Sequence, residues 1–171
     1  MQVVIVLIFL IKRIMEKILS KEECKVIIEK VQTQEWQRID KSCHYDQSFY
    51  EDIELENKFE TFFGKQFTKR PLMKVLRLSK GDKLPIFSGD YDKVTDSSFD
   101  RYKGTNFIIQ TYLNEDFEGG ILTFVKDTYK PKTGYGILQN KSNKCKISEV
   151  TDGTAYLIFC YISNFVSTNI L

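Results

Sequence analysis

Short apolar segments separated by turn residues constrain the fold of this chain more than any other feature. Segments of this length are typical of strands that tight turns join to antiparallel neighbours. The segments are 73–78, 107–113, 121–125, 134–138 and 155–162, and Gly, Asp and Asn residues lie between them. The positions taken to alternate with polar neighbours are Val75, Ile108, Leu122, Ile137 and Leu157. The pattern predicts two facing antiparallel sheets over residues 72–162, as in a β sandwich or jelly roll.

Two helices are predicted before these strands. Ser20 and Glu23 have the spacing of a capping box, and apolar residues then recur with a helical period from about residue 21 to 33. A second helical pattern, rich in Phe, begins at Phe49 and ends at Gly64. Because a sheet has to cover its apolar face, we expect the helix at 21–33 to pack against the outside of one sheet.

Gly119 and Gly120 stand between the segment that ends at Leu113 and the one that begins at Ile121. The chain has to reverse here, and glycine adopts positive φ without a steric cost. We therefore expect a tight connection in which one or both glycines have positive φ.

Length and charge narrow the class of protein. The chain has 171 residues, 42% apolar and 28% charged, which is typical of a single globular domain. Its 25 Lys and Arg against 23 Asp and Glu leave a net charge of +2, and the signs alternate along the chain. This argues against nucleic acid as a partner. The chain has a single histidine, His44, which excludes any site that needs two histidines of one chain. His44 lies in a polar stretch, so we predict that it is at the surface.

The four cysteines are far apart and have no CxxC spacing. This argues against a zinc knuckle or a redox pair. The cysteines are Cys24, Cys43, Cys145 and Cys160, and we expect packed thiols, with two disulfides as the alternative in an oxidising compartment.

The N-terminus carries an unbroken apolar run at residues 3–11. It is shorter than the roughly 20 residues that span a membrane, and it lacks a basic n-region and a small-residue cleavage site. A buried first strand, an uncleaved anchor and a signal peptide stay open, and so does membrane contact through residues 3–11. We divide the chain into an apolar segment, 1–17, and one domain, 18–171, and favour a cytoplasmic location.

Five motifs in a fixed order resemble the Fe(II)/2-oxoglutarate-dependent dioxygenases of the prolyl 4-hydroxylase type, over roughly residues 18–162. They are Ile18-Leu19-Ser20-Lys21-Glu22-Glu23-Cys24, Lys74-Val75-Leu76-Arg77-Leu78-Ser79-Lys80-Gly81, Tyr112-Leu113-Asn114-Glu115-Asp116-Phe117-Glu118-Gly119-Gly120 with Phe124, Pro131-Lys132-Thr133-Gly134 and Val150-Thr151-Asp152-Gly153-Thr154. The resemblance implies an α+β, mainly β fold: a double-stranded β-helix (jelly roll) with N-terminal helices packed on one sheet. In active members its open end holds the metal and the oxo acid.

The resemblance also implies where the site residues fall. Two histidines and a carboxylate bind iron(II) in this family, and a basic side chain pairs with the distal carboxylate of 2-oxoglutarate. In this chain the first histidine corresponds to Phe87, the aspartate to Gly89, the second histidine to Cys145, the basic residue to Ala155 and a tyrosine that bonds the oxo acid to Leu78. The sequence therefore predicts a pseudoenzyme that needs neither iron(II) nor 2-oxoglutarate.

A metal site with a shifted register is the fallback. Asp90 and Asp92 lie near the family's aspartate position, and Cys145 offers a thiolate. An aspartate in such a loop is more often a turn residue, and a lone cysteine on a strand is more often a packed thiol. Lys144 and Lys146 flank Cys145, so on a strand they point away from the face that Cys145 occupies.

Three functional hypotheses follow. The first is a degenerate dioxygenase-fold protein that acts as a binding or regulatory module for a protein or peptide, through a groove lined by Phe87, Tyr91 and Phe99. The second is an active dioxygenase that hydroxylates a protein side chain with non-standard metal ligands. The third is a structural interaction protein docked by its N-terminal apolar segment.

Overall fold

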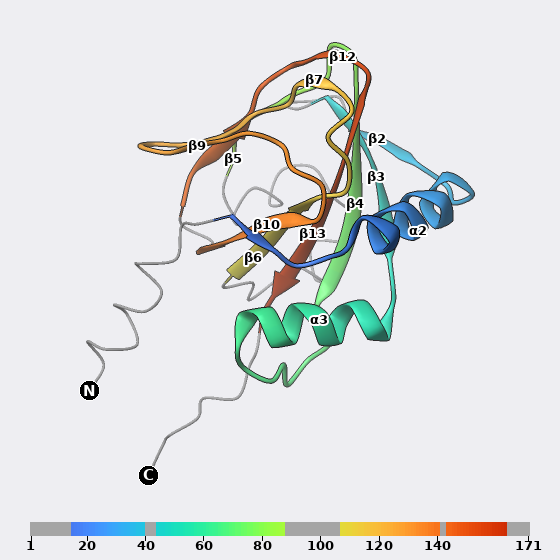
Figure 1. The fold of residues 1–171 in the computed structure, drawn as a ribbon, viewed down its shortest axis with the longest axis vertical. Coiled ribbons are helices and arrows are strands. Elements are labelled where there is room, and N and C mark those ends of the chain that lie inside the picture. The colour runs from blue at the N-terminus through green and yellow to red at the C-terminus, as the bar shows by residue number, and fades with distance from the viewer. Residues whose placement is uncertain (1–14, 40–43, 88–106, 141–142, 164–171) are drawn as a thin grey trace.

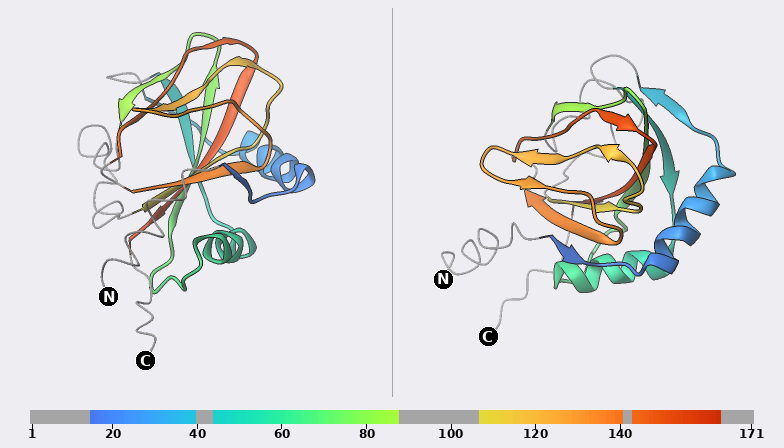
Figure 2. Two further views of the ribbon diagram at one scale, coloured as in Figure 1. Left: turned by 60° about the vertical axis from the view of Figure 1, so that its left-hand side comes forward. Right: turned by 45° about the horizontal axis from the view of Figure 1, so that its top comes forward.

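The computed structural model describes residues 15–39, 44–87, 107–140 and 143–163, and two facing sheets make up most of it (Figures 1 and 2). The larger sheet has the strand order β1-β10-β6-β13-β4-β3-β2. Its strands are β1 (Glu16–Lys17), β2 (Gln37–Ile39), β3 (Tyr45–Tyr50), β4 (Leu72–Ser79), β6 (Phe107–Tyr112), β10 (Tyr135–Asn140) and β13 (Thr154–Ile162). The smaller sheet has the order β5-β11-β8-β9, with β5 (Leu84–Phe87), β8 (Leu122–Phe124), β9 (Thr128–Tyr129) and β11 (Cys145–Ile147).

The path of the chain is that of a jelly roll. From β4 onward it alternates between the sheets: β4, β6, β10 and β13 belong to the larger one, and β5, β8, β9 and β11 to the smaller one. The pairings among these strands are all antiparallel. A separate ribbon of β7 (Glu118–Gly119) and β12 (Val150–Asp152) lies at the top of Figure 1, over one end of the barrel. The predicted antiparallel jelly roll is therefore confirmed.

The larger sheet is buried on both faces, which separates two cores. On β13, Leu157 and Phe159 point into the barrel, whereas Ile158 and Cys160 point outward. Val75 belongs to the outer core. The prediction that Val75, in the same way as Leu157, alternates with polar neighbours is therefore wrong. The physical reason is that helices cover the outer face, which makes both faces of these strands apolar.

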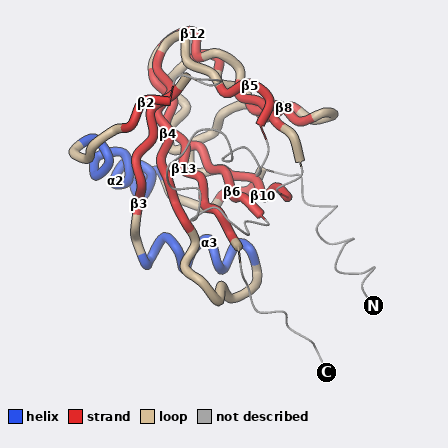
Figure 3. The backbone as a smooth tube through the Cα atoms, turned by 180° about the vertical axis from the view of Figure 1, so that it is seen from behind, coloured by secondary structure: helices blue, strands red, loops and turns tan. Residues whose placement is uncertain are grey.

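Both predicted helices lie on the outer face of the larger sheet (Figures 2 and 3). Helix α2 (Lys21–Gln32) begins with the predicted capping box: the Glu23 amide donates to Ser20 Oγ at 3.1 Å, and the Ser20 amide donates to Glu23 Oε2 at 2.8 Å. Helix α3 (Ile53–Phe63) ends at Gly64 as predicted.

The predicted start of the second helix at Phe49 is wrong. Phe49 lies in β3, where it pairs with Lys74 of β4. The helix begins later because the Asp52 side chain accepts the Leu55 amide at 3.1 Å and caps the first turn. Apolar spacing alone did not separate the end of a strand from the start of a helix.

An ionic network holds the turn between β4 and β5. Arg38 donates two hydrogen bonds to the Asp82 carboxylate, at 2.9 and 2.7 Å, and the Ser79 amide donates a third at 2.9 Å. The Val150 amide donates to the Asp82 carbonyl at 3.0 Å. The turn is thereby joined both to β2 and to the ribbon over the barrel end.

Some predictions concern residues outside the described ranges. The apolar run at 3–11, the fourth cysteine Cys43 and the acidic loop at 88–103 lie there. Cys24, Cys145 and Cys160 are free and buried, as expected for packed thiols. In the described part of the chain, no helix has the length and apolar character needed to cross a membrane.

The structure confirms positive φ at Gly119 and Gly120, 79° and 61°. We predict that Gly119→Ala is much more destabilising than Gly64→Ala. Both glycines have φ of 79°, but a Cβ on Gly119 would lie 2.1 Å from the Glu149 carbonyl oxygen, whereas Gly64 has no atom within 4 Å of that position. Urea denaturation should give a loss of about 1 kcal/mol for Gly64→Ala and roughly 3 kcal/mol or more for Gly119→Ala. Equal losses would contradict the close backbone approach.

A second prediction concerns pH. Partial burial opposes ionisation of Asp82, but the hydrogen bonds from Arg38 and the Ser79 amide and the charge of Arg38 outweigh it and lower the pKa below 3.8. Because the pKa is lower in the folded state, the stabilisation is complete above the unfolded-state pKa and is lost as pH falls through the folded-state pKa. Asp82→Asn should therefore cost about 1–2 kcal/mol at pH 7 and progressively less below pH ~4.

Glu56→Gln is the matched control for this measurement. It removes the ion pair with Arg70, which is also 2.7 Å long but involves a guanidinium that is 59% exposed. Solvent screens such a pair, so thermal melts should show a smaller loss at pH 7. A loss for Asp82→Asn that is constant from pH 7 to pH 3 would contradict the prediction.

Candidate functional site

The strand register of the barrel pairs four of the residues that the sequence singled out. Leu78 of β4 is the cross-strand partner of Ala155 of β13. Phe87 of β5 is the cross-strand partner of Cys145 of β11. Four positions taken from distant parts of the sequence thus form two pairs, one in each sheet of the barrel.

The Leu78–Ala155 pair lies deep in the barrel, beneath the β7–β12 ribbon. Both residues are fully buried and belong to the inner core with Leu84 and Leu157. Tyr112 also lies in this core, and its hydroxyl donates to the Gly120 carbonyl at 2.6 Å. Burial raises the pKa of that phenol well above its ordinary value, so it stays a neutral donor. This end of the barrel is apolar and closely packed.

Cys145 faces the interior, and its neighbours Lys144 and Lys146 are exposed, as the strand geometry predicted. Its thiol has two polar contacts: Gln110 Nε2 lies 3.6 Å from Sγ, and Sγ lies 3.4 Å from Gln139 Oε1. Burial raises the pKa of Cys145 to about 12, although these two contacts act in the opposite direction. The group is therefore a neutral thiol, a weak ligand for metals and a poor nucleophile.

Three interior polar residues were missed by the sequence analysis: Gln110 on β6, Gln139 on β10 and Lys74 on β4. Each is only 2% exposed. Gln110 stands within an apolar segment and Gln139 directly follows one, and neither position shows a period-two signal. For Lys74 the sequence did hold a signal. Lys74 and Arg77 are three residues apart, and two positions with that spacing on a strand point to opposite faces, so only one of the two basic side chains can lie on the outer face.

Lys74 places a cation inside the barrel, but far from the base position of the family. Its Nζ lies 5.1 Å from the centroid of the Tyr161 ring. It pairs with Phe159, which in turn pairs with Gln110, so Lys74 and Gln110 lie at one level of the barrel. Leu78 is four residues further along β4, roughly 13 Å away at the usual rise of a strand.

Other candidate residues fall elsewhere. Gly89, Asp90, Asp92, Tyr91 and Phe99 lie outside the described residues, and for Phe87 only the backbone in β5 is described. In the described ranges, no three His, Cys, Asp or Glu side chains gather as a metal site would need. His44 is exposed and bridges Lys83 through its backbone, as predicted for a surface residue.

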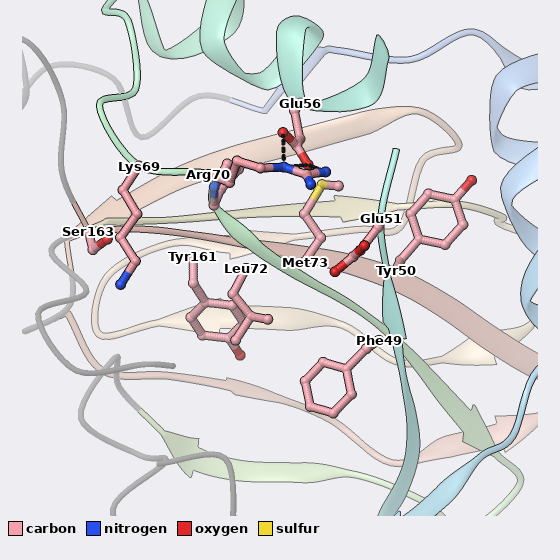
Figure 4. A pocket seen from close by; sticks show the side chains of 11 residues that line it. Phe49, Tyr50, Glu51, Glu56, Lys69, Arg70, Leu72, Met73, Tyr161 and Ser163 are labelled. Carbon is pink, nitrogen blue, oxygen red and sulfur yellow. Dashed lines mark hydrogen bonds and ion pairs between the residues drawn. The ribbon is translucent and has the colours of Figure 1, made fainter. Parts of the chain in front are cut away.

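A cavity of about 200 Å³ lies where β4 begins and β13 ends (Figure 4). Tyr161, Leu72 and Phe49 line its apolar side, and Lys69, exposed, stands at its edge. The Arg70 guanidinium is already paired with Glu56 at 2.7 Å. The cavity lies at the opposite end of β4 and β13 from the Leu78–Ala155 pair.

Comparisons with known proteins show which folds this barrel resembles. No family model matches the sequence, and no curated protein is significantly similar to it. Among solved structures, a prolyl-4-hydroxylase of Pseudomonas putida superposes with a TM-score of 0.70 at 10% identity, over 96% of this chain and 99% of its own. The chain has the fold of a prolyl hydroxylase.

Two further structures agree. The viral collagen prolyl hydroxylase of Paramecium bursaria Chlorella virus 1, in its 2OG complex, has a TM-score of 0.65 at 19% identity, over 86% of this chain and 92% of its own. A 2OG-Fe(II) oxygenase family oxidoreductase of Burkholderia pseudomallei has a TM-score of 0.63 at 11% identity, over 85% and 80%. The fold implied by the motif resemblance is confirmed, while the chemistry has to be argued from the site itself.

We predict that Cys145 resists alkylation in the folded protein. Only the thiolate reacts, and a pKa raised from 9.0 to about 12 lowers the thiolate fraction roughly 10³-fold. Lys146→Cys is the control, since it places an exposed thiol on the same strand. Mass spectrometry after iodoacetamide treatment at pH 8 should find the new cysteine modified and Cys145 unmodified until the protein is denatured. Rapid labelling of Cys145 in the native protein would contradict this.

Proposed function

We propose that this chain is a degenerate prolyl 4-hydroxylase-like protein that acts as a binding module for a protein or peptide. The observation that carries the proposal is the register of the barrel strands. It aligns the family's ligand positions two by two, and the residues found there have little of the family's chemistry. The fold supports the position of the site, and the side chains support the loss of its cofactors.

The metal positions do not suit iron(II). Phenylalanine at position 87 has no donor atom, and the thiol of Cys145 is neutral and held by two amides. Glycine at position 89 also offers no side-chain ligand. Iron(II) in such folds prefers two imidazoles and a carboxylate.

The oxo acid position does not suit a carboxylate. The position that the resemblance assigns to the cation paired with 2-oxoglutarate is held by Ala155, whose buried cross-strand partner is Leu78. A carboxylate without a partner in an apolar interior is strongly unfavourable. The interior cation that the structure describes, Lys74, lies at the other end of β4.

The barrel end around Tyr161 supports the binding role. The cavity there is lined by aromatic and aliphatic side chains with charged residues at its edge, as in many ligand and peptide sites. A partner that inserts an apolar side chain beside Tyr161 and Leu72 would bury it against the interior. The regulatory role that we propose for the module requires no turnover.

The test is anaerobic calorimetry and metal analysis of the wild-type protein with iron(II) and 2-oxoglutarate. We expect no stoichiometric binding of either. The combined variant Phe87→His, Gly89→Asp, Cys145→His, Ala155→Lys should gain iron affinity, because it returns the ligand set to the aligned positions. Circular dichroism reports whether this variant is folded.

A displaced histidine is the matched control. In a second variant, Ile147→His replaces Cys145→His, since Ile147 is equally buried and faces the same interior two residues away. It should gain less iron affinity than the aligned variant. Stoichiometric iron with 2-oxoglutarate turnover in the wild type would overturn the proposal and favour an enzyme that uses Asp90 or Asp92 with Cys145.

A further inference from the structure

Two buried glutamines meet inside the barrel. Gln110 and Gln139 are diagonal neighbours on β6 and β10, since Gln110 pairs with Ile137 and Gln139 with Ile108. Gln110 Nε2 donates to Gln139 Oε1, and Cys145 contacts both amides. The three side chains form an uncharged polar cluster. We call its two glutamines, Gln110 and Gln139, the amide pair.

Two atoms of the amide pair have no hydrogen-bond partner among the described residues. They are Gln110 Oε1 and Gln139 Nε2, and both are fully buried. The finding does not depend on which way the amides are turned. Turning both exchanges the atoms but again leaves one oxygen and one amino group, and turning one alone sets like atoms against each other.

Gln47 provides the contrast. It is as buried as the amide pair, but its Nε2 donates to Gln37 Oε1 at 2.9 Å. Buried amides in folded proteins are nearly always satisfied in this way. A buried acceptor on one member of a hydrogen-bonded pair and a buried donor on the other therefore point to a bound group that supplies both complementary atoms.

The chemistry of that group follows from the two atoms. A carboxamide presents a donor to Gln110 Oε1 and an acceptor to Gln139 Nε2, and like the pair itself it fits in either orientation. A carboxylate has no donor and would face the Gln110 oxygen, while an ammonium has no acceptor. Phe124 lies beside Cys145 and Phe159 beside Gln110, and Lys74 is the partner of Phe159 on its other side.

We propose that the barrel binds an uncharged amide group between Gln110 and Gln139. The inference rests on the proposed binding function and names the ligand class of that site. Gln139 lies in the same cross-strand row as Ile108, Tyr161 and Leu72, and the last two line the cavity of Figure 4. From Gln139 to Tyr161 the row crosses two gaps between neighbouring strands, a distance of roughly 10 Å.

The test uses the full chain labelled with ¹⁵N and follows the side-chain amide signals of the two glutamines. The probes are propionamide, which represents an Asn or Gln side chain, N-methylacetamide, which represents a peptide bond, and propionate. We expect at least one of the two amides to shift both signals in a saturable manner and propionate to shift neither. The amide that shifts them shows whether the bound group is an Asn or Gln side chain or a peptide bond.

Two variants complete the design. Gln110→Leu should weaken the saturable shift at Gln139 roughly tenfold or more, because one of two hydrogen bonds is lost. Gln47→Leu, the matched control, should leave it unchanged. If Gln110→Leu does not fold, the wild-type titration with the three probes still decides.

One result overturns the inference. If no amide shifts the signals, and a long-lived water molecule gives cross-relaxation to both side chains, the pair is satisfied by buried water only. That outcome leaves the proposed binding module standing, because the iron and 2-oxoglutarate titrations test it separately. Turnover with iron would instead overturn the proposed function.

Discussion

The antiparallel register of β13 between β4 and β6 is the constraint on which the rest of the structure depends. It sets Ala155 opposite Leu78, and Phe159 between Lys74 and Gln110. Successive side chains on a strand point to opposite faces, so a slip of one residue would turn the barrel-facing set outward. Because both faces of this sheet are buried, the register fixes which polar side chains lie on each face. Each interior level of the barrel is therefore defined by one row of cross-strand partners.

The Arg38–Asp82 ion pair and the neutral amide cluster lie in different parts of this molecule. The Arg38–Asp82 pair joins the turn after β4 to β2 where solvent still reaches the guanidinium. Inside the barrel, Gln110, Gln139 and Cys145 are uncharged and contact one another. This distribution lowers the cost of burial, since a neutral amide needs only a hydrogen-bond partner whereas a buried ion also needs a countercharge.

Parts of the fold could be predicted because local sequence specifies them. The capping box at Ser20 and Glu23 needs only three residues of spacing, and the long strands β4, β6 and β13 are mostly apolar in sequence. The short strands β5, β7, β9, β11 and β12 have two to four residues each and exist only through their partners. Phe49 shows the same limit, because its place in β3 depends on pairing with β4 rather than on its neighbours in sequence.

The sequence by itself determined the jelly-roll class, since this depends on residue identity and order along the chain. Only the tertiary structure decided which polar residues face the interior. Gln110 and Gln139 are 29 residues apart, and they meet because β6 and β10 pair in one register. Contacts of this kind arise from the closure of long loops, and no pattern within one strand encodes the partner that another strand brings.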